Sequence, residues 1–382
     1  MNWVLITGAY PPDQGGLADY AAVVARELAR HGDTVTVVTG PMELKAVPVA
    51  EGVRLLALSD HFGRQGLREL DAFLETVPPT TRLFVQYVPQ AFGPRRNSRF
   101  RGLPLTFAWW LRRREAHHAA LPVWTLFHEA KVTAPPGSNV SRRILSVVTG
   151  QMLGWTAAAS QRIFVAMPAW QAHIEPHLSP RQRVEYLPIP SNIATAVDEH
   201  ARQLTRAHLL PCGQRAMVGH FGTFSSDVAC LMEHLVRQSL REHPDRHILL
   251  VGDGSREFLS HLSGDRARVT ATGRLEAEDV ARHLSACDLM IQPFPDGAST
   301  RRGSIMAGLA LGVPVVSNLG EASEAIWQKE RALALAPDPE SMLGLVDQLL
   351  SRPAERLALG ERGRALYEDQ FSLAHTVRVL RA

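Results

Sequence analysis

The chain has 382 residues, enough for two domains of about 190 residues each. Apolar residues make up 45% of it and charged residues 21%, a balance that excludes a disordered protein. The formal net charge is only +3, from 41 Lys and Arg against 38 Asp and Glu, so we do not expect a nucleic-acid binder.

Cysteine content and hydropathy exclude further classes of protein. The three cysteines, Cys212, Cys230 and Cys287, lie far apart in sequence and form no Cys-x-x-Cys pair, which excludes a disulfide scaffold. The longest apolar run, Ile305 to Val316, is too short to span a bilayer, and the first residues lack the basic region of a signal peptide. We therefore expect a cytoplasmic protein.

The chain opens with a strand, a glycine-containing loop and a helix. Trp3 to Thr7 is an apolar run, and Gly15 and Gly16 lie in the loop after it. Apolar residues then recur at helical spacing up to Gly32, and the β-branched run Thr34 to Thr39 follows. This order is a βαβ unit and predicts a parallel sheet. The later strands expected in this half are residues 82–86, 123–127 and 163–166.

A second series of strands begins near Ala216. Before it, Tyr186 to Asn192 contains two prolines and suits a linker, so we place the domain boundary at about residues 192–210. We expect two α/β domains that face one another across a cleft at the carboxyl ends of their strands. The strands expected in the second domain are residues 217–221, 248–251, 269–271, 289–292 and 313–317.

The most informative loop follows the expected strand 289–292. It runs from Pro293 to Ser304 and precedes an apolar helix. Backbone amides at a helix N-terminus and the guanidinium groups of Arg301 and Arg302 together favour an oxyanion such as pyrophosphate. Cations are unfavourable at a helix N-terminus unless an anion is bound there, which favours this interpretation over a solvated first turn.

Two features of the first half fit a ligand site as well. Gly15 and Gly16 precede a helix, where they would let an anion approach the backbone N–H groups, although a glycine doublet is also typical of a tight turn. His128 ends the expected strand 123–127, where an imidazole can hydrogen-bond a sugar hydroxyl or polarise a reacting group.

In their order and spacing these features resemble the retaining glycosyltransferases of the GT-B fold, family four. Residues that match the family include Pro11-Pro12 before Gly15-Gly16, His128-Glu129, Gly252-Asp253-Gly254, Gly273-Arg274, Glu278-Asp279, Ala286-Cys287-Asp288 and Gly312 to Val316. The resemblance implies two Rossmann-like domains: residues 1–195 on the acceptor side, and residues 210–371 binding a nucleotide-sugar donor. It also implies that the last helix, residues 372–382, crosses back to the first domain.

The implied reaction moves a hexosyl group from a nucleoside diphosphate sugar to an acceptor hydroxyl, with retention of configuration and without a metal. His128 would position the sugar, and the nucleobase would lie against Gly273, Arg274 and Leu275. The sequence also contains no Asp-x-Asp, which argues against a divalent cation carrying the diphosphate. We expect no cofactor besides the donor substrate.

Two departures from the family concern donor binding. The positions of the family's Glu-x7-Glu pair fall on Ser299 and Ala307, and the loop of residues 222–227 lacks the basic residues that bind the diphosphate. We hypothesise a relocated clamp, in which Thr300, Arg301 and Arg302, with Gly15 and Gly16, bind the diphosphate.

In the same hypothesis, Asp296 reads the sugar hydroxyls and acts with His128 at the catalytic centre. Ser299 and Ser304 then take the contacts to the donor sugar and ribose.

Residues 95–114 carry arginines at both ends and aromatic and aliphatic residues, among them Phe107, Trp109 and Trp110, between them. This segment could contact an anionic membrane surface, which would place the protein at the inner face of the membrane; the alternative is a helix packed inward with solvated or paired arginines. Two other functions stay open: a catalytically silent nucleotide-sugar binder or scaffold, motivated by the missing acid pair, and a nucleotide-sugar epimerase, for which this loop offers only Asp296 as an acid.

Overall fold

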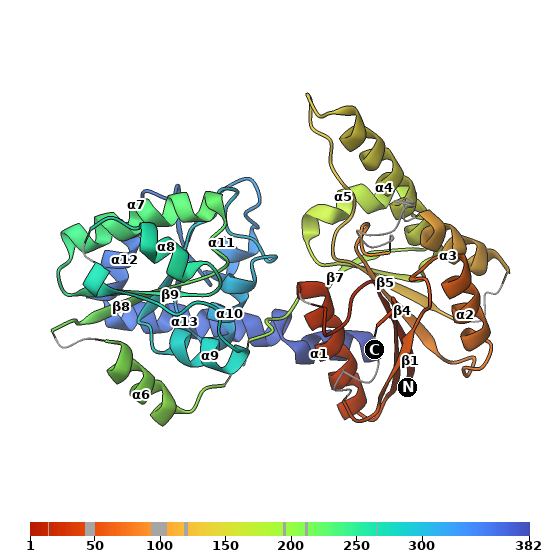
Figure 1. Cartoon of the computed structure of the whole chain (residues 1–382), viewed down its shortest axis with the longest axis horizontal. Coiled ribbons are helices and arrows are strands. Elements are labelled where there is room, and N and C mark those ends of the chain that lie inside the picture. Colours follow the sequence, from red (N-terminus) through yellow and green to blue (C-terminus); the bar gives the residue numbers. More distant parts are fainter. Residues whose placement is uncertain are drawn as a thin grey trace. The chain divides into compact units, whose positions relative to one another are not determined.

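The computed structural model describes residues 1–13, 15–42, 50–92, 105–117, 121–193, 196–210, 213–264 and 266–382, without the side chains of 115–117. The chain divides into two compact units, both visible in Figure 1: Met1–Ile189 with Thr376–Ala382, and Pro190–His375. Each unit is built on one sheet in which all described pairings are parallel, as the βαβ pattern predicts.

The first unit contains a seven-stranded sheet in the order β3-β2-β1-β4-β5-β6-β7. Its central strands are buried on both faces, which explains their nearly continuous apolar sequences. The strands are β1 (Asn2–Thr7), β2 (Thr34–Thr39), β3 (Val53–Ala57), β4 (Arg82–Tyr87), β5 (Val123–Phe127), β6 (Arg162–Val165) and β7 (Val184–Tyr186). The α-helices of this unit are α1 (Gly16–Arg30), α2 (Arg64–Leu74), α3 (Leu105–His117), α4 (Val140–Ala159) and α5 (Gln171–Ile174).

The second unit contains a six-stranded sheet in the order β10-β9-β8-β11-β12-β13. The strands are β8 (Ala216–Phe221), β9 (Arg246–Val251), β10 (Val269–Ala271), β11 (Leu289–Gln292), β12 (Val315–Asn318) and β13 (Ala334–Ala336). The helices are α6 (Glu199–Leu209), α7 (Ser226–Glu242), α8 (Ser255–His261), α9 (Ala277–Ser285), α10 (Gly303–Leu311), α11 (Ile326–Glu330), α12 (Met342–Ser351) and α13 (Pro353–Leu366). Helix α10 is apolar after Ser304, and its residues 305–310 are buried, as the apolar sequence predicts.

The C-terminal helix α14 (Leu373–Arg381) belongs to the first unit from Thr376 onward. Two arginines of the first sheet hold its end: Arg82 Nη1 donates to the carbonyl of Leu380 at 2.9 Å, and Arg162 Nη1 to that of Val379 at 3.3 Å. Arg381 pairs with Asp33 at 3.2 Å, so the last residues are fixed by polar contacts inside this unit.

The sequence predicts the central strands of both sheets but not β3, β7 and β13. All three are edge strands with a single hydrogen-bonded neighbour. An edge strand is short and needs little apolar surface, so its sequence carries a weak strand signal.

Residues 95–104 of the segment that we considered for membrane contact lie outside the described residues. In the described remainder, Phe107 and Leu111 are buried, and Arg114 pairs with Asp71 at 2.8 Å. Trp110 is buried as well and donates its indole N–H to the same carboxylate. The face of α3 formed by Phe107, Trp110, Leu111 and Arg114 is therefore packed inward, as in the alternative to membrane contact.

No helix in the described ranges is long and apolar enough to cross a membrane.

Candidate functional site

Two loops at the carboxyl edge of the second sheet are fixed against each other. Asn318, at the end of β12, accepts from the backbone N–H of Phe294 at 2.9 Å and donates to its carbonyl at 2.9 Å. Gly297 has a φ of 88°, and a Cβ there would come within 2.4 Å of the Gly320 nitrogen. This contact requires glycine on conformational and steric grounds. The loop after β11, which carries most of the predicted donor residues, is thus pinned to the loop after β12.

Glu324 supports this loop, and the sequence analysis did not identify it. Its carboxylate accepts from Thr300 twice: from the backbone N–H, and from Oγ1 at 2.8 Å. Burial raises the pKa of Glu324 above its ordinary value, and the Thr300 hydrogen bonds partly oppose that rise. The available signal was a glutamate shortly after β12 (Val315–Asn318), the strand that neighbours β11 in the sheet. Thr300 itself is buried and fixed by these contacts.

Arg302 has an anionic partner within its own loop. It forms an ion pair with Asp296, and its guanidinium lies 4.4 Å from the ring centroid of Phe294. The positive charge of Arg302 near the start of α10 is therefore balanced by Asp296 without a bound ligand. The expectation that both arginines bind a diphosphate loses support for Arg302. Arg301 is exposed and forms no ion pair with any described residue. Of the two predicted clamp residues, Arg301 is the one free to meet a diphosphate.

The two positions where the family carries acids are closed. Ser299 is 2% exposed and Ala307 is fully buried, so neither side chain offers a solvent-facing polar group in place of the missing carboxylates. Ser304 is partly exposed in the first turn of α10, and no side chain caps the backbone N–H groups at that end. Uncapped N–H groups at a helix start attract anions, so the start of α10 has donors of the kind that the oxyanion hypothesis requires.

The predicted nucleobase residues lie at the same edge of the second sheet. The carbonyl of Gly273 accepts from the Gly252 N–H at 3.2 Å, and the Ser255 hydroxyl accepts from the Gly273 N–H at 2.9 Å. Arg274 is exposed and Leu275 is partly buried. The backbone around Gly273 is thereby held to the start of α8.

A cavity of about 510 Å³ opens beside these loops, lined by Thr223, Phe224, Asp253 and Gly254 among others. Phe224 has a φ of 51°, an uncommon conformation for a residue with a side chain, and its ring packs edge-on against His220 at 5.0 Å. Backbone strain of this kind is typical of functional loops.

His220 does not replace the basic residues that this loop lacks. Its Nδ1 lies 3.0 Å from the Ile291 carbonyl, and a carbonyl only accepts, so Nδ1 carries the hydrogen. Nε2 is left with a lone pair and has no hydrogen-bond partner among the described residues. Burial lowers the pKa of His220 to about 4, so the ring is neutral near pH 7 and cannot offer a positive charge to a phosphate.

His128 lies at the carboxyl edge of the first sheet, directly after β5. Its Nε2 is buried and has no partner in the described part of the chain. Burial lowers its pKa to about 3, so the imidazole is neutral near pH 7. The Tyr20 ring packs edge-on against it at 5.0 Å, and the Tyr20 hydroxyl is also buried and unpartnered among those residues. Tyr20 is a second residue that sequence reasoning missed, since it looked like an ordinary core position of α1.

Gly15 and Gly16 stand at the start of α1, also in the first unit. Gly15 has a φ of 135°, and no side chain caps this helix start. Among the described residues, a Cβ built at either glycine meets no atom within 4 Å, so there is space beside this helix start. The structure places these glycines and His128 in the first unit, and Asp296, Ser299 to Arg302, Ser304 and Gly273 to Leu275 in the second.

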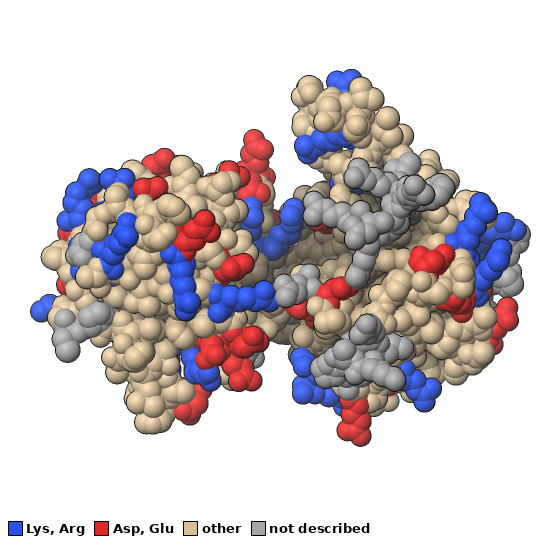
Figure 2. Space-filling view, viewed as in Figure 1, with Lys and Arg blue, Asp and Glu red and all other residues tan. Residues whose placement is uncertain are grey.

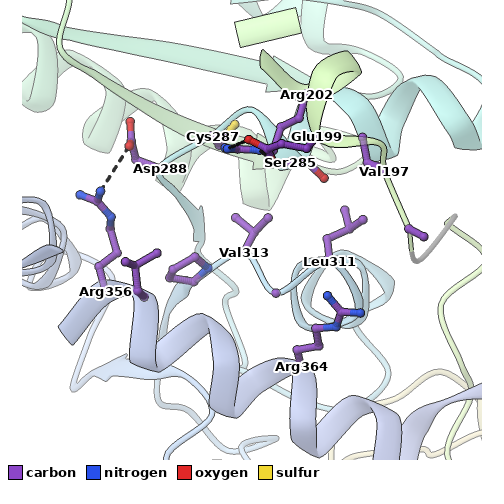
Figure 3. Close-up of a pocket in the computed structure, with 14 residues that line it drawn as sticks. Val197, Glu199, Arg202, Ser285, Cys287, Asp288, Leu311, Val313, Arg356 and Arg364 are labelled. Carbon is purple, nitrogen blue, oxygen red and sulfur yellow. Dashed lines mark hydrogen bonds and ion pairs between the residues drawn. The ribbon is translucent and has the colours of Figure 1, made fainter. Parts of the chain in front are cut away.

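A further pocket of about 560 Å³ lies at the opposite, amino edge of the second sheet (Figure 3). Asp288, just before β11, accepts from the Met217 N–H and pairs with Arg206 at 2.8 Å and with Arg356 at 3.5 Å. In parallel α/β sheets ligands bind outside the carboxyl ends of the strands. We therefore interpret these charges as a structural cluster that ties α6 and α13 to the sheet.

In the described ranges, no three His, Cys, Asp or Glu side chains are grouped so that they could hold a metal ion.

Comparisons with known proteins show what part of the chain is similar to a known family. Residues 215–352 match the family model described as glycosyl transferases group 1. The GDP-mannose-dependent monoacylated alpha-(1-6)-phosphatidylinositol monomannoside mannosyltransferase of Corynebacterium glutamicum is 33% identical over 147 residues, which cover 35% of this chain. The match spans only 38% of that relative's length.

Solved structures match over nearly the whole chain at low identity. Sucrose-phosphate synthase from Thermosynechococcus elongatus has a TM-score of 0.66 at 17% identity, covering 100% of this chain and 97% of that one. WaaG, a glycosyltransferase of lipopolysaccharide biosynthesis, has a TM-score of 0.63 at 16% identity, covering 99% and 98%. Anabaena HepE in complex with UDP and glucose has a TM-score of 0.60 at 14% identity, covering 100% and 98%. The fold is therefore that of the GT-B glycosyltransferases, and residues 215–352 of this chain match the group 1 glycosyltransferase model.

Proposed function

We propose that the protein is a retaining glycosyltransferase of family four, which moves a hexosyl group from a nucleoside diphosphate sugar to an acceptor hydroxyl. One observation carries the proposal. Every candidate donor residue of the second unit, from Gly273 to Glu324, lies inside the range that matches the group 1 family model, and at the carboxyl edge of one sheet. The donors named for similar proteins, GDP-mannose and UDP-glucose, give the first compounds to test.

The chemistry follows from the charges at these loops. As the bond from sugar to β-phosphate breaks, negative charge grows on the leaving diphosphate. Preorganised N–H donors and a cation aimed at that charge lower the barrier. Arg301 supplies the cation in the proposal, and the uncapped start of α10 supplies N–H groups. These donors do the work that a metal would otherwise do, so the proposed reaction is metal-independent.

The first unit contributes hydrogen bonding rather than proton transfer. His128 is neutral near pH 7, so in the proposal it positions a sugar hydroxyl and does not act as a general acid. The buried Tyr20 hydroxyl beside it is a further hydrogen-bonding group of the same kind.

A silent donor-binding protein is the second candidate, because Ser299 and Ala307 are buried at the positions of the family's acid pair. The two functions separate in one experiment. The protein is incubated with GDP-mannose or UDP-glucose in EDTA, released nucleoside diphosphate is followed by chromatography, and the anomer of the released sugar is assigned by NMR.

EDTA-resistant release of the retained anomer, reduced in Arg301→Ala but not in Glu321→Gln, supports the transferase. Glu321 is an exposed acid close to the same loops and serves as the matched control. Donor binding in a calorimetric titration without release of nucleoside diphosphate supports the silent protein, and the absence of both binding and release contradicts the two proposals.

A further inference from the structure

Helix α4 carries an apolar stripe that is largely exposed to solvent. Val140, Ile144 and Val147 are 70%, 53% and 74% exposed. Their spacing of four and three residues places them on one face of the helix. The other half of α4, with Met152 and Leu153, is buried in the core of the first unit. The amino-terminal part of α4 projects from the body of that unit (Figure 1).

The charged residues of the chain segment that forms this stripe have one sign. Between Glu129 and Glu175 the chain has no acidic residue, although 38 of its 382 residues are Asp or Glu. Arg142 and Arg143 are both exposed on the first turn of α4. Arg142 Nε donates to the Thr133 carbonyl at 2.9 Å. The visible face of the projection in Figure 2 is tan and blue, without red.

We propose that this projecting end of α4, which we call the α4 tip (Val140, Arg142, Arg143, Ile144 and Val147), docks on the surface of an anionic lipid bilayer. Aliphatic side chains on one face with flanking arginines are the composition of a helix that lies in the membrane interface. Apolar side chains enter the boundary between headgroups and acyl chains while the arginines meet anionic headgroups. The excess of positive charge at the tip favours an anionic lipid surface over a neutral one.

The α4 tip is a different surface from the segment 95–114 that the sequence suggested. In the described part of that segment, the apolar residues Phe107 and Leu111 are buried, and Arg114 is paired with Asp71. Trp109 is 49% exposed, with the Arg113 guanidinium 5.3 Å from its ring centroid, and gives a way to test the two surfaces separately. The inference does not rest on the proposed transferase activity.

The test is co-sedimentation of the full chain with vesicles of phosphatidylcholine alone, or of phosphatidylcholine with phosphatidylglycerol. The variant V140S/I144S/V147S removes the stripe at exposed positions, so its thermal unfolding midpoint should not change. The matched control L204S/L357S removes two apolar side chains of the second unit that are 58% and 64% exposed.

We expect the unmodified chain to sediment with the anionic vesicles. The stripe variant should lower the partition coefficient at least tenfold, and Arg143→Gln should lower it about fivefold. The control and Trp109→Ser should leave it unchanged.

Three results would overturn the proposal. One is no sedimentation of the unmodified chain with either vesicle. Another is a stripe variant that binds as well as the control. The third is a dimer of the unmodified chain in light scattering that the stripe variant dissociates, because the tip would then be an interface with a second copy.

Discussion

Replacing Glu324 with Gln tests whether this residue, which follows β12, fixes the loop after β11 that carries the donor residues. The carboxylate accepts two hydrogen bonds from Thr300, and Gln has only one acceptor oxygen. A hydrogen bond to a charged group contributes about 1.5–3 kcal/mol. The cost of burying the Glu324 carboxylate is larger than the effect of the Thr300 hydrogen bonds on its ionisation, so its pKa stays above the ordinary value. We expect a loss of about 2 kcal/mol in the local opening free energy of the loop.

Hydrogen–deuterium exchange of the Thr300 amide measures that loss directly. A change of about 2 kcal/mol corresponds to about a thirtyfold faster exchange. Nucleoside diphosphate affinity should fall in the same variant, because Arg301 follows Thr300 in the chain. Glu321→Gln should change neither quantity. Wild-type protection at Thr300 in Glu324→Gln would refute the view that this carboxylate positions the loop.

The pH dependence of stability gives a second readout for the same residue. Burial raises the folded-state pKa of Glu324 above its ordinary value of 4.5, so between these two pKa values the folded chain binds more protons than the unfolded chain. The contribution of this group to stability is therefore fully present below pH 4.5 and declines as pH rises through the folded pKa. Glu324→Gln should remove this slope from the pH profile of the unfolding midpoint.

Three further predictions follow from other contacts. Arg301→Ala should weaken nucleoside diphosphate binding about tenfold or more and leave the melting temperature unchanged. Arg302→Ala should also lower the melting temperature, because it removes the contacts of Arg302 to Asp296 and Phe294. His128, with a pKa lowered to about 3 from 6.5, should lower stability as pH falls from 6.5 toward 3, and His128→Phe should reduce that slope in urea unfolding. Asp288→Asn should reduce the free energy of unfolding by about 2–3 kcal/mol, because it weakens the half-buried ion pairs to Arg206 and Arg356. An unchanged urea midpoint would show that these ion pairs contribute nothing to stability.

The fold was predictable where local sequence determines it. Strands such as β1 and β8 are buried on both faces, and their apolar runs therefore predict a strand from sequence. Edge strand β13 reads Ala334-Leu335-Ala336, a composition that suits a helix equally well. Its strand conformation comes from pairing with β12, a contact that no local pattern encodes.

The candidate site shows the same division. The loop of Ser299 to Ser304 could be found because it follows a strand and precedes an apolar helix. The pairing of Asp296 with Arg302 depends on how that loop folds back on itself, and the role of Glu324 depends on the adjacency of β11 and β12. Both require tertiary geometry, which is why the sequence suggested two free arginines where the structure leaves one.

Calorimetric titration of GDP and UDP in EDTA, against the unmodified chain and Arg301→Ala, tests the central claim most directly. The account predicts that one of the two nucleotides binds the unmodified chain despite EDTA, and that its affinity falls about tenfold or more in the variant. Failure of both nucleotides to bind the unmodified chain would contradict the assignment of the second unit as a nucleotide-sugar donor domain.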